Sequence, residues 1–275
     1  MSHKNRLIFS YLFLGVMSVI FAFPFYFLIV STTNTSLAIT NGSLLPGSHF
    51  VENLHALFEQ TDMWRAIGNS AVITLIQTVL ALLIGSAAGY GFEIYKSRVT
   101  EVIFRIILLS MMIPFAAIMI PLFRLFGQLT MLSEYIGIDS YASVYLPYLA
   151  TAFLIFYFRQ NTKMFPRELL EAGRIDGLSE VGCFFFLYMP TMKNTYAAAA
   201  IITFMNSWNN YIWPLVVIQS ADKQTVPLLI ANLGSSYSPD FGLIMMAVLI
   251  ATLPTLTIFF VLQKHFVAGM LGASK

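Results

Sequence analysis

Charged residues are scarce in this sequence: they make up 10% of its 275 positions, whereas 58% of the positions are hydrophobic and the mean hydropathy is +0.76. Soluble domains carry about 25% charged residues, so this composition excludes a soluble globular protein. The length accommodates about six membrane spans of about 20 residues each, together with their loops. We therefore expect an all-α integral membrane protein with a single transmembrane domain over residues 1–275, embedded in a lipid bilayer.

Cysteine and the motifs of common enzymes are also rare or missing. The one cysteine, Cys183, excludes an internal disulfide and a cysteine-based zinc site, and its aromatic neighbours indicate a packed thiol. No lysine follows a glycine, so there is no Walker A loop, and no H-E-x-x-H or G-x-S-x-G motif occurs. The few basic residues form no stripe that could follow a nucleic-acid backbone. We expect no enzymatic activity, no bound metal or cofactor, and no nucleic-acid partner for this chain.

Long apolar runs are what the sequence does contain. The first run is too long for the apolar part of a signal peptide, so we expect it to be retained as a span. Small residues between Gly85 and Gly89 would let a neighbouring helix approach the second run closely. Prolines inside several runs are tolerable where neighbouring groups satisfy the freed carbonyls. The six predicted spans are residues 7–30, 69–93, 102–126, 141–158, 195–219 and 241–263.

The basic residues predict the orientation, because lysine and arginine favour cytoplasmic loops. With the N-terminus inside, twelve of the 15 basic residues fall on the inner side and three on the outer side. The sequence therefore predicts that both termini and the loop 163–193 are cytoplasmic. The inner set is Lys4, Arg6, Lys96, Arg98, Arg105, Arg159, Lys163, Arg167, Arg174, Lys193, Lys264 and Lys275, and the outer set is Arg65, Arg124 and Lys223.

Residues 165–177 form a charged segment between the fourth and fifth predicted spans. Arg167, Glu171 and Arg174 recur at helical spacing, which predicts a short amphipathic helix with Phe165, Leu169, Ala172 and Gly173 on its other face. Asp176-Gly177 predicts its end, and Ser179 can cap a second short helix that leads towards Pro190. Two interpretations remain open: a solvated loop helix whose charges pair with one another, or a docking helix for another protein.

The segment Glu171-Ala172-Gly173-Arg174-Ile175-Asp176-Gly177, with Pro190 thirteen positions after Gly177, resembles the "EAA" loop of ABC importer permeases. Gly173 departs from the second alanine that is usual in that family. Further resemblances cover nearly the whole chain and point to the carbohydrate-uptake branch, in particular to the shorter, six-span permease of the maltose-transporter type. They are Asn69-Ser70, Pro121-Leu122-Phe123, Trp208-Asn209-Asn210-Tyr211-Ile212-Trp213-Pro214-Leu215 and Gln263-Lys264-His265-Phe266-Val267-Ala268-Gly269.

This resemblance implies a type I ABC importer permease fold in a bacterial cell membrane, with six transmembrane helices. It also implies partners: a second permease subunit, two cytoplasmic ATPase subunits that carry ATP-Mg, an extracellular binding protein that touches the loop 224–240, and a sugar substrate. The coupling helix would dock into a cleft of the ATPase. The coupling residues that it implies here are Arg167, Glu168, Glu171, Ala172, Gly173, Asp176 and Gly177.

A second group of candidates lies in the fifth predicted span and the second. Polar side chains at membrane depth either bond neighbouring helices or line a water-filled path, and both interpretations stay open. Amides match sugar hydroxyls, and the faces of Trp208 and Trp213 match the apolar faces of pyranose rings. The candidate path residues are Gln77, Thr203, Asn206, Trp208, Asn209 and Asn210.

Three other functions are compatible with parts of this pattern. A permease of the same class could carry a non-sugar solute such as a glycerol phosphate. An ion-coupled secondary transporter would need ionisable residues within its spans, and few are present. A membrane-embedded enzyme is disfavoured because the catalytic motifs are missing.

Overall fold

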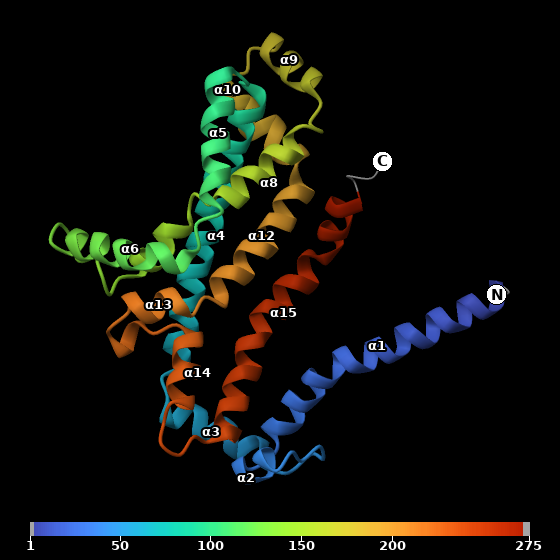
Figure 1. Ribbon diagram of the computed structural model, residues 1–275, viewed down its shortest axis with the longest axis vertical. Coiled ribbons are helices and arrows are strands. Elements are labelled where there is room, and N and C mark those ends of the chain that lie inside the picture. Colours follow the sequence, from blue (N-terminus) through green and yellow to red (C-terminus); the bar gives the residue numbers. More distant parts are fainter. Residues whose placement is uncertain (1–2, 272–275) are drawn as a thin grey trace. The chain divides into compact units, whose positions relative to one another are not determined.

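The computed structural model describes the backbone of residues 3–271 and, within that range, all side chains except those of residues 3–6, 8 and 264–271. Every regular element in this part of the chain is a helix (Figure 1). The chain divides into two compact units, Met1–Trp64 with Leu229–Leu253 and Arg65–Leu228 with Pro254–Lys275. Lys275 and the side chains of Lys4, Arg6 and Lys264, which entered the orientation count, lie outside the described residues, as do the side chains of the C-terminal motif after Gln263.

The first unit joins the end of one long helix to the beginning of another. The Asn53 side chain donates hydrogen bonds to the carbonyl oxygens of Thr32 at 2.9 Å and Asn34 at 3.0 Å. Ser36 Oγ donates to Asp240 Oδ1 at 2.6 Å, beside the first turn of α15. The polar segment after the first predicted span folds into short helices. The helices are α1 (His3–Thr32), α2 (Ser36–Thr40) and α3 (Phe50–Gln60), with parts of α4 (Met63–Ile94), α14 (Val226–Gly234) and α15 (Phe241–Leu271).

The second unit is built on the close packing of α4 against α8 (Ala152–Thr162). A Cβ atom placed on Gly89 would lie 2.6 Å from Cβ of Phe158 and 2.7 Å from the backbone nitrogen of Arg159, and one on Gly85 would lie 3.0 Å from Cβ of Leu154. This confirms the close approach predicted from the small residues. The other elements are α5 (Arg98–Ser110), α6 (Phe115–Thr130), α7 (Tyr141–Tyr145), η1 (Leu146–Tyr148), α9 (Arg167–Ile175), α10 (Glu180–Gly182), the π-helix η2 (Cys183–Tyr188), α11 (Met189–Thr191), α12 (Lys193–Trp208), α13 (Ile212–Val217) and η3 (Ala221–Lys223).

Three predicted spans are not single straight helices. The span 102–126 is divided at Pro114, which is the N-cap of α6, and α5 and α6 meet at 100°. The span 141–158 bends by 44° between Tyr148 and Ala152, and its second helix continues to Thr162. The span 195–219 is interrupted between Trp208 and Ile212. Proline lacks an N–H and restricts the preceding residue, and asparagine bonds its own backbone, so these residues divide the helices.

Within the part of the chain that the structure describes, three helices are long and apolar enough to cross a membrane, or up to five if each bent pair counts as one span. The three are Phe9–Thr32, Met63–Ile94 and Phe241–Gln263. The fifth predicted span, 195–219, contains α12, which has 16 residues and is not among them. The all-helical fold is confirmed, whereas the count of six and the orientation stay predictions.

Candidate functional site

Helix α9 is a short charged helix anchored on one narrow side. Leu170 is 2% exposed and Phe165, just before the helix, is 4% exposed, and both join the apolar cluster built around η2. The ring of Phe165 lies 5.3 Å from that of Tyr188, at 61°. Cys183 is fully buried in the same cluster, which confirms the packed thiol. The helix is therefore held by an apolar cluster in which the segment that follows it packs together with Tyr90 of α4.

The buried side of α9 differs from the predicted apolar face. Leu169 is 41% exposed and Ala172 is also exposed, so the face opposite the charges is only partly packed. Gly173 instead faces inward: a Cβ placed on it would lie 2.5 Å from Cδ1 of Leu187. Gly173, one of the implied coupling residues, is therefore directed toward Leu187 and leaves no room there for a docking protein. The cluster around η2 covers only one narrow side of α9. That side contains Leu170 and Gly173, which lie three residues apart in the helix.

The predicted stop at Asp176-Gly177 is confirmed in detail. Gly177 has φ = +85°, its N–H donates to the carbonyl of Arg174 at 3.1 Å, and the N–H of Leu178 donates to that of Gly173 at 2.9 Å. These two bonds make a Schellman motif, which satisfies the last carbonyls of the helix. Ser179 then caps the next helix through the N–H of Gly182 at 3.1 Å, as predicted. The length of α9 is thus fixed by its own sequence.

The acidic side chains of α9 are exposed and unengaged. Among the described residues, Glu168, Glu171 and Asp176 have no side-chain hydrogen bond or ion pair. The two arginines of α9 point elsewhere, since Arg167 pairs with Glu93 and Arg174 with Glu180. The interpretation in which the charges of this helix pair with one another is therefore wrong. The helix presents a free acidic surface on a rigid support.

Arg174 ties the end of α9 to the next helix. Its Nε and Nη2 atoms donate to the two carboxylate oxygens of Glu180 at 2.7 Å and 3.0 Å, and Tyr95 donates its hydroxyl hydrogen to the same carboxylate. The hydrogen bond from Arg174, followed by that from Tyr95, lowers the pKa of the Glu180 carboxyl. The hydrogen bond with Glu180 likewise raises the pKa of the Arg174 guanidinium. Glu180 is therefore ionised at neutral pH and holds α9 against α10.

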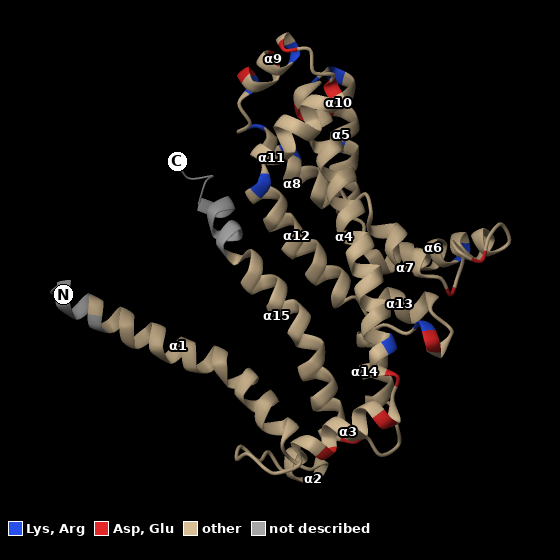
Figure 2. Ribbon diagram, turned by 180° about the vertical axis from the view of Figure 1, so that it is seen from behind, with Lys and Arg blue, Asp and Glu red and all other residues tan. Residues whose placement is uncertain are grey.

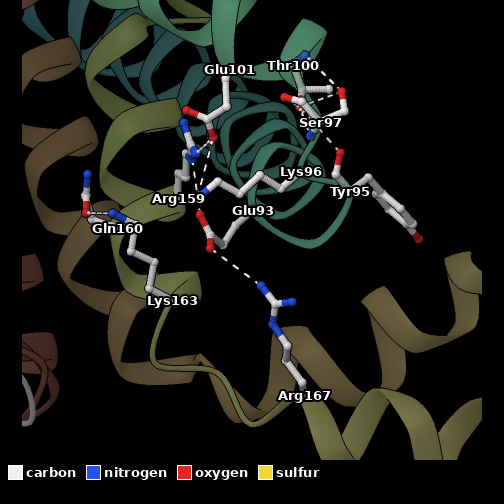
Figure 3. A network of polar contacts seen from close by, with 10 residues as sticks. All are labelled: Glu93, Tyr95, Lys96, Ser97, Thr100, Glu101, Arg159, Gln160, Lys163 and Arg167. Atoms are coloured by element: carbon white, nitrogen blue, oxygen red, sulfur yellow. Dashed lines mark hydrogen bonds and ion pairs between the residues drawn. The ribbon is translucent and has the colours of Figure 1, made fainter.

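Next to the first residue of α9 lies a buried ionic cluster, which was not predicted from the sequence (Figure 3). Arg159, whose side chain is 5% exposed, donates from Nε to Glu93 at 3.3 Å and from Nη2 to Glu101. Arg167 Nη2 lies 3.7 Å from the other oxygen of Glu93. The sequence did contain a signal for it, since Glu93 and Arg159 stand at the ends of two apolar runs. Buried charges are rare unless they are paired, so these two residues could have been expected to bond each other. Within the second unit, charges gather at the end that carries α5, α9 and α10 (Figure 2).

The candidate path residues fall into two groups. Gln77 and Thr203 are buried, and Gln77 accepts a hydrogen bond at 2.9 Å from Ser207, a further polar residue of α12. Asn206 and Asn209 are exposed and lie three residues apart. Thr203, Asn206 and Asn210 would share one face of a continuous helix, but α12 ends at Trp208 and Asn210 lies beyond it.

Neither tryptophan of this stretch presents a free face. Trp208 is 3% exposed and stacks on Phe204 with ring centroids 5.9 Å apart. Trp213 is fully buried, and its Nε1 donates to the carbonyl of Ser143 at 2.7 Å. In this conformation the stacking of indole faces on a sugar is not available. The two side chains pack the core of the second unit.

Asn69 and Ser70, which open the second predicted span, fasten the segment 222–226. The Asn69 amide donates to the carbonyls of Asp222 at 2.9 Å and Gln224 at 2.8 Å, and Ser70 Oγ accepts from the N–H of Val226 at 2.8 Å. This motif therefore has a structural role, and the loop that it holds continues into helix α14.

Residues 81–272 match the family described as "Binding-protein-dependent transport system inner membrane component". The chain is 46% identical over 266 residues to the lactose transport system permease protein LacG of Rhizobium radiobacter, covering 97% of this chain and 95% of the relative. It is 33% identical over 264 residues to the arabinooligosaccharides transport system permease protein AraQ of Bacillus subtilis (strain 168), covering 94% and 92%.

A solved structure shares the fold. It belongs to a bacterial ABC transporter involved in the import of the acidic polysaccharide alginate, with a TM-score of 0.80, 21% identity and coverage of 97% of this chain and 99% of that chain. The family match spans most of the sequence, including the charged segment and its buried cluster. This chain is therefore a multi-pass inner-membrane permease component of a binding-protein-dependent transport system.

Proposed function

We propose that this chain is a transmembrane subunit of an ATP-driven importer that carries a sugar or oligosaccharide. The relatives that support this substrate class are permeases named for lactose and for arabinooligosaccharides. The substrate would be delivered by an extracellular binding protein, in agreement with the family description. Hydrolysis of ATP-Mg takes place in separate cytoplasmic ATPase subunits.

The free acidic surface of α9 is the observation that carries this proposal. Glu168, Glu171 and Asp176 are exposed on a helix whose length is fixed by a Schellman motif and whose base is buried. Three carboxylates without partners suit a cleft that supplies basic side chains and backbone N–H groups. The orientation predicted from the basic residues places this surface in the cytoplasm, where the ATPase is.

The working cycle follows from this attachment. Closure of the ATPase pair on ATP displaces α9, and the spans attached to it move between inward-facing and outward-facing arrangements. A second permease subunit completes the path. We place the exposed amides of Asn206 and Asn209 on that path, with Gln77, Thr203, Trp208 and Asn210 shaping the wall behind them. The loop 224–240 is the contact that we propose for the binding protein.

Charge reversal at Glu171 tests the proposal. Glu171→Arg removes a free carboxylate and no described hydrogen bond, so the fold should remain intact. We expect the ATPase to be lost when the complex is purified, and sugar uptake to fall by about 100-fold or more, because a like charge would face the basic cleft. Glu134→Arg changes another exposed glutamate, on the predicted outer side, and should leave both measurements unchanged.

Two results would contradict the proposal. One is full retention of the ATPase by Glu171→Arg. The other is sugar transport by the purified chain alone, driven by an ion gradient in vesicles without any ATPase, which would indicate a secondary transporter.

A further inference from the structure

Arg159 bonds three helices together at one buried point. It lies in the last turn of α8, and its guanidinium contacts Glu93 in the last turn of α4 and Glu101 in the first turn of α5. The guanidinium carbon also lies 4.0 Å from the centroid of the Phe104 ring. One turn before Glu93, the backbone of α4 touches α8 at Gly89. The ends of α4, α5 and α8 therefore form one rigid group.

Stability alone is a poor explanation for this arrangement. Burial removes Glu93 and Arg159 from water, with 8% and 5% of their side chains exposed. Desolvation largely offsets the attraction within such pairs, and apolar side chains of similar volume are often equally stabilising. Ionic pairs, however, fix direction and register in a way that apolar contacts do not.

Glu93 also reaches the charged helix. Its Oε2 atom accepts from Arg159, while its Oε1 atom lies 3.7 Å from Nη2 of Arg167, the first residue of α9 (Figure 3). The side chain of Arg167 is 62% exposed, so this contact lies at the boundary between the buried cluster and the free surface. Among the described residues it is the ion pair that joins α9 to α4.

We propose that Glu93 is a positioning residue that transmits the displacement of α9, through Arg167, to α4 and, through Arg159 and Glu101, to α5 and α8. This inference rests on the importer function proposed above. The other anchors of α9 are the Arg174–Glu180 pair with α10 and the apolar cluster around η2, where Tyr90 of α4 makes apolar contact and no ion pair. Removing the Arg167–Glu93 pair should therefore leave docking intact and weaken the coupling between ATP hydrolysis and substrate movement.

The test uses the complete transporter in vesicles, with its ATPase subunits, companion permease and binding protein. Arg167→Gln, Glu93→Gln and the double variant are compared for sugar imported per ATP hydrolysed and for ATPase retained on purification. We expect the transport ratio to fall about five-fold or more in each single variant, with ATPase retention unchanged. Because Arg167 acts through its contact with Glu93, the double variant should transport no less sugar per ATP than Glu93→Gln alone.

Arg98→Gln is the matched control, because Arg98 is an exposed arginine at the start of α5 with no described partner. It should keep the wild-type ratio. Unchanged ratios in Arg167→Gln, or losses that multiply in the double variant, would overturn the inference. If Glu93→Gln does not assemble, Arg167→Gln decides alone, since its side chain is mostly exposed. Loss of ATPase retention already in the wild type would instead contradict the importer function itself.

Discussion

Asp139 shows how one residue can organise a loop outside the spans. It adopts φ = +60°, and its carboxylate accepts hydrogen bonds from the N–H groups of Gln219 and Ser220, each at 2.9 Å, and from the Ser220 hydroxyl. Lys223 lies 3.3 Å from the same carboxylate. Partial burial would raise the pKa of Asp139, but the bonds from Ser220, Gln219 and Lys223 outweigh it and lower the pKa from 3.8 to about 2.

This lowered pKa predicts how the loop responds to acid. A carboxyl with a depressed folded pKa contributes stability above its unfolded value, and loses it as the pH falls from about 4 to about 2. Asp139→Asn should lower the free energy of unfolding by about 1 kcal/mol at neutral pH, a figure reduced for solvent screening. Unfolding followed in detergent should show this difference shrink with acidification. Asp222→Asn is the control, and a difference that does not change with pH would contradict the prediction.

Gly173 illustrates what a single position reveals only in context. Taken by itself, a glycine in place of the family's alanine favours a looser helix, since glycine disfavours helices by up to about 1 kcal/mol. In the structure its missing side chain makes room for Leu187. Gly173 therefore allows α9 to pack closely against η2. Glu171, in contrast, is exposed and available to a partner.

Among the helices, α4 and α8 form the contact on which the second unit depends. The backbone of α8 blocks any side chain at Gly89, whereas a Cβ atom on Gly91, two residues later in α4, would meet nothing within 4 Å. The Cβ atom of Phe158 and the backbone of α8 cannot move aside as the tip of a flexible side chain could. The two glycines therefore provide a matched pair of substitutions.

Gly89→Ala should destabilise the protein by about 1 to 3 kcal/mol, because the added methyl group overpacks the helix contact. Gly91→Ala should instead be neutral or stabilising by up to about 1 kcal/mol, because alanine favours the helix. Thermal unfolding of both variants in the same detergent measures the difference. Equal stability of the two variants would mean that α4 and α8 are not packed this closely.

For the molecule as a whole, the orientation in the membrane is the main prediction left to test. Ile175, on α9, is 86% exposed and Tyr237, in the loop before α15, is fully exposed, whereas the native Cys183 is buried. Single cysteines at these two positions would therefore be accessible to a thiol reagent. Labelling of the buried Cys183 by the same reagent should stay low as long as the protein is folded.

We expect Ile175→Cys to react with a membrane-impermeant maleimide only from the cytoplasmic side, and Tyr237→Cys only from the opposite side. Right-side-out and inverted membrane vesicles provide the two conditions. Reaction of both cysteines from one side would rule out the six-span arrangement and would remove the free acidic surface from the reach of an ATPase.

The sequence by itself determined the membrane class, the apolar runs and the end of α9, because these depend on composition and on local backbone preferences. It also predicted the close approach at Gly85 and Gly89. Tertiary structure decided which side of α9 is buried, where the spans bend, and that Trp208 and Trp213 pack inward. It alone brought Glu93, Glu101, Arg159 and Arg167 together. Those four residues lie on four different helices, and helical spacing within one segment carries no information about contacts between segments.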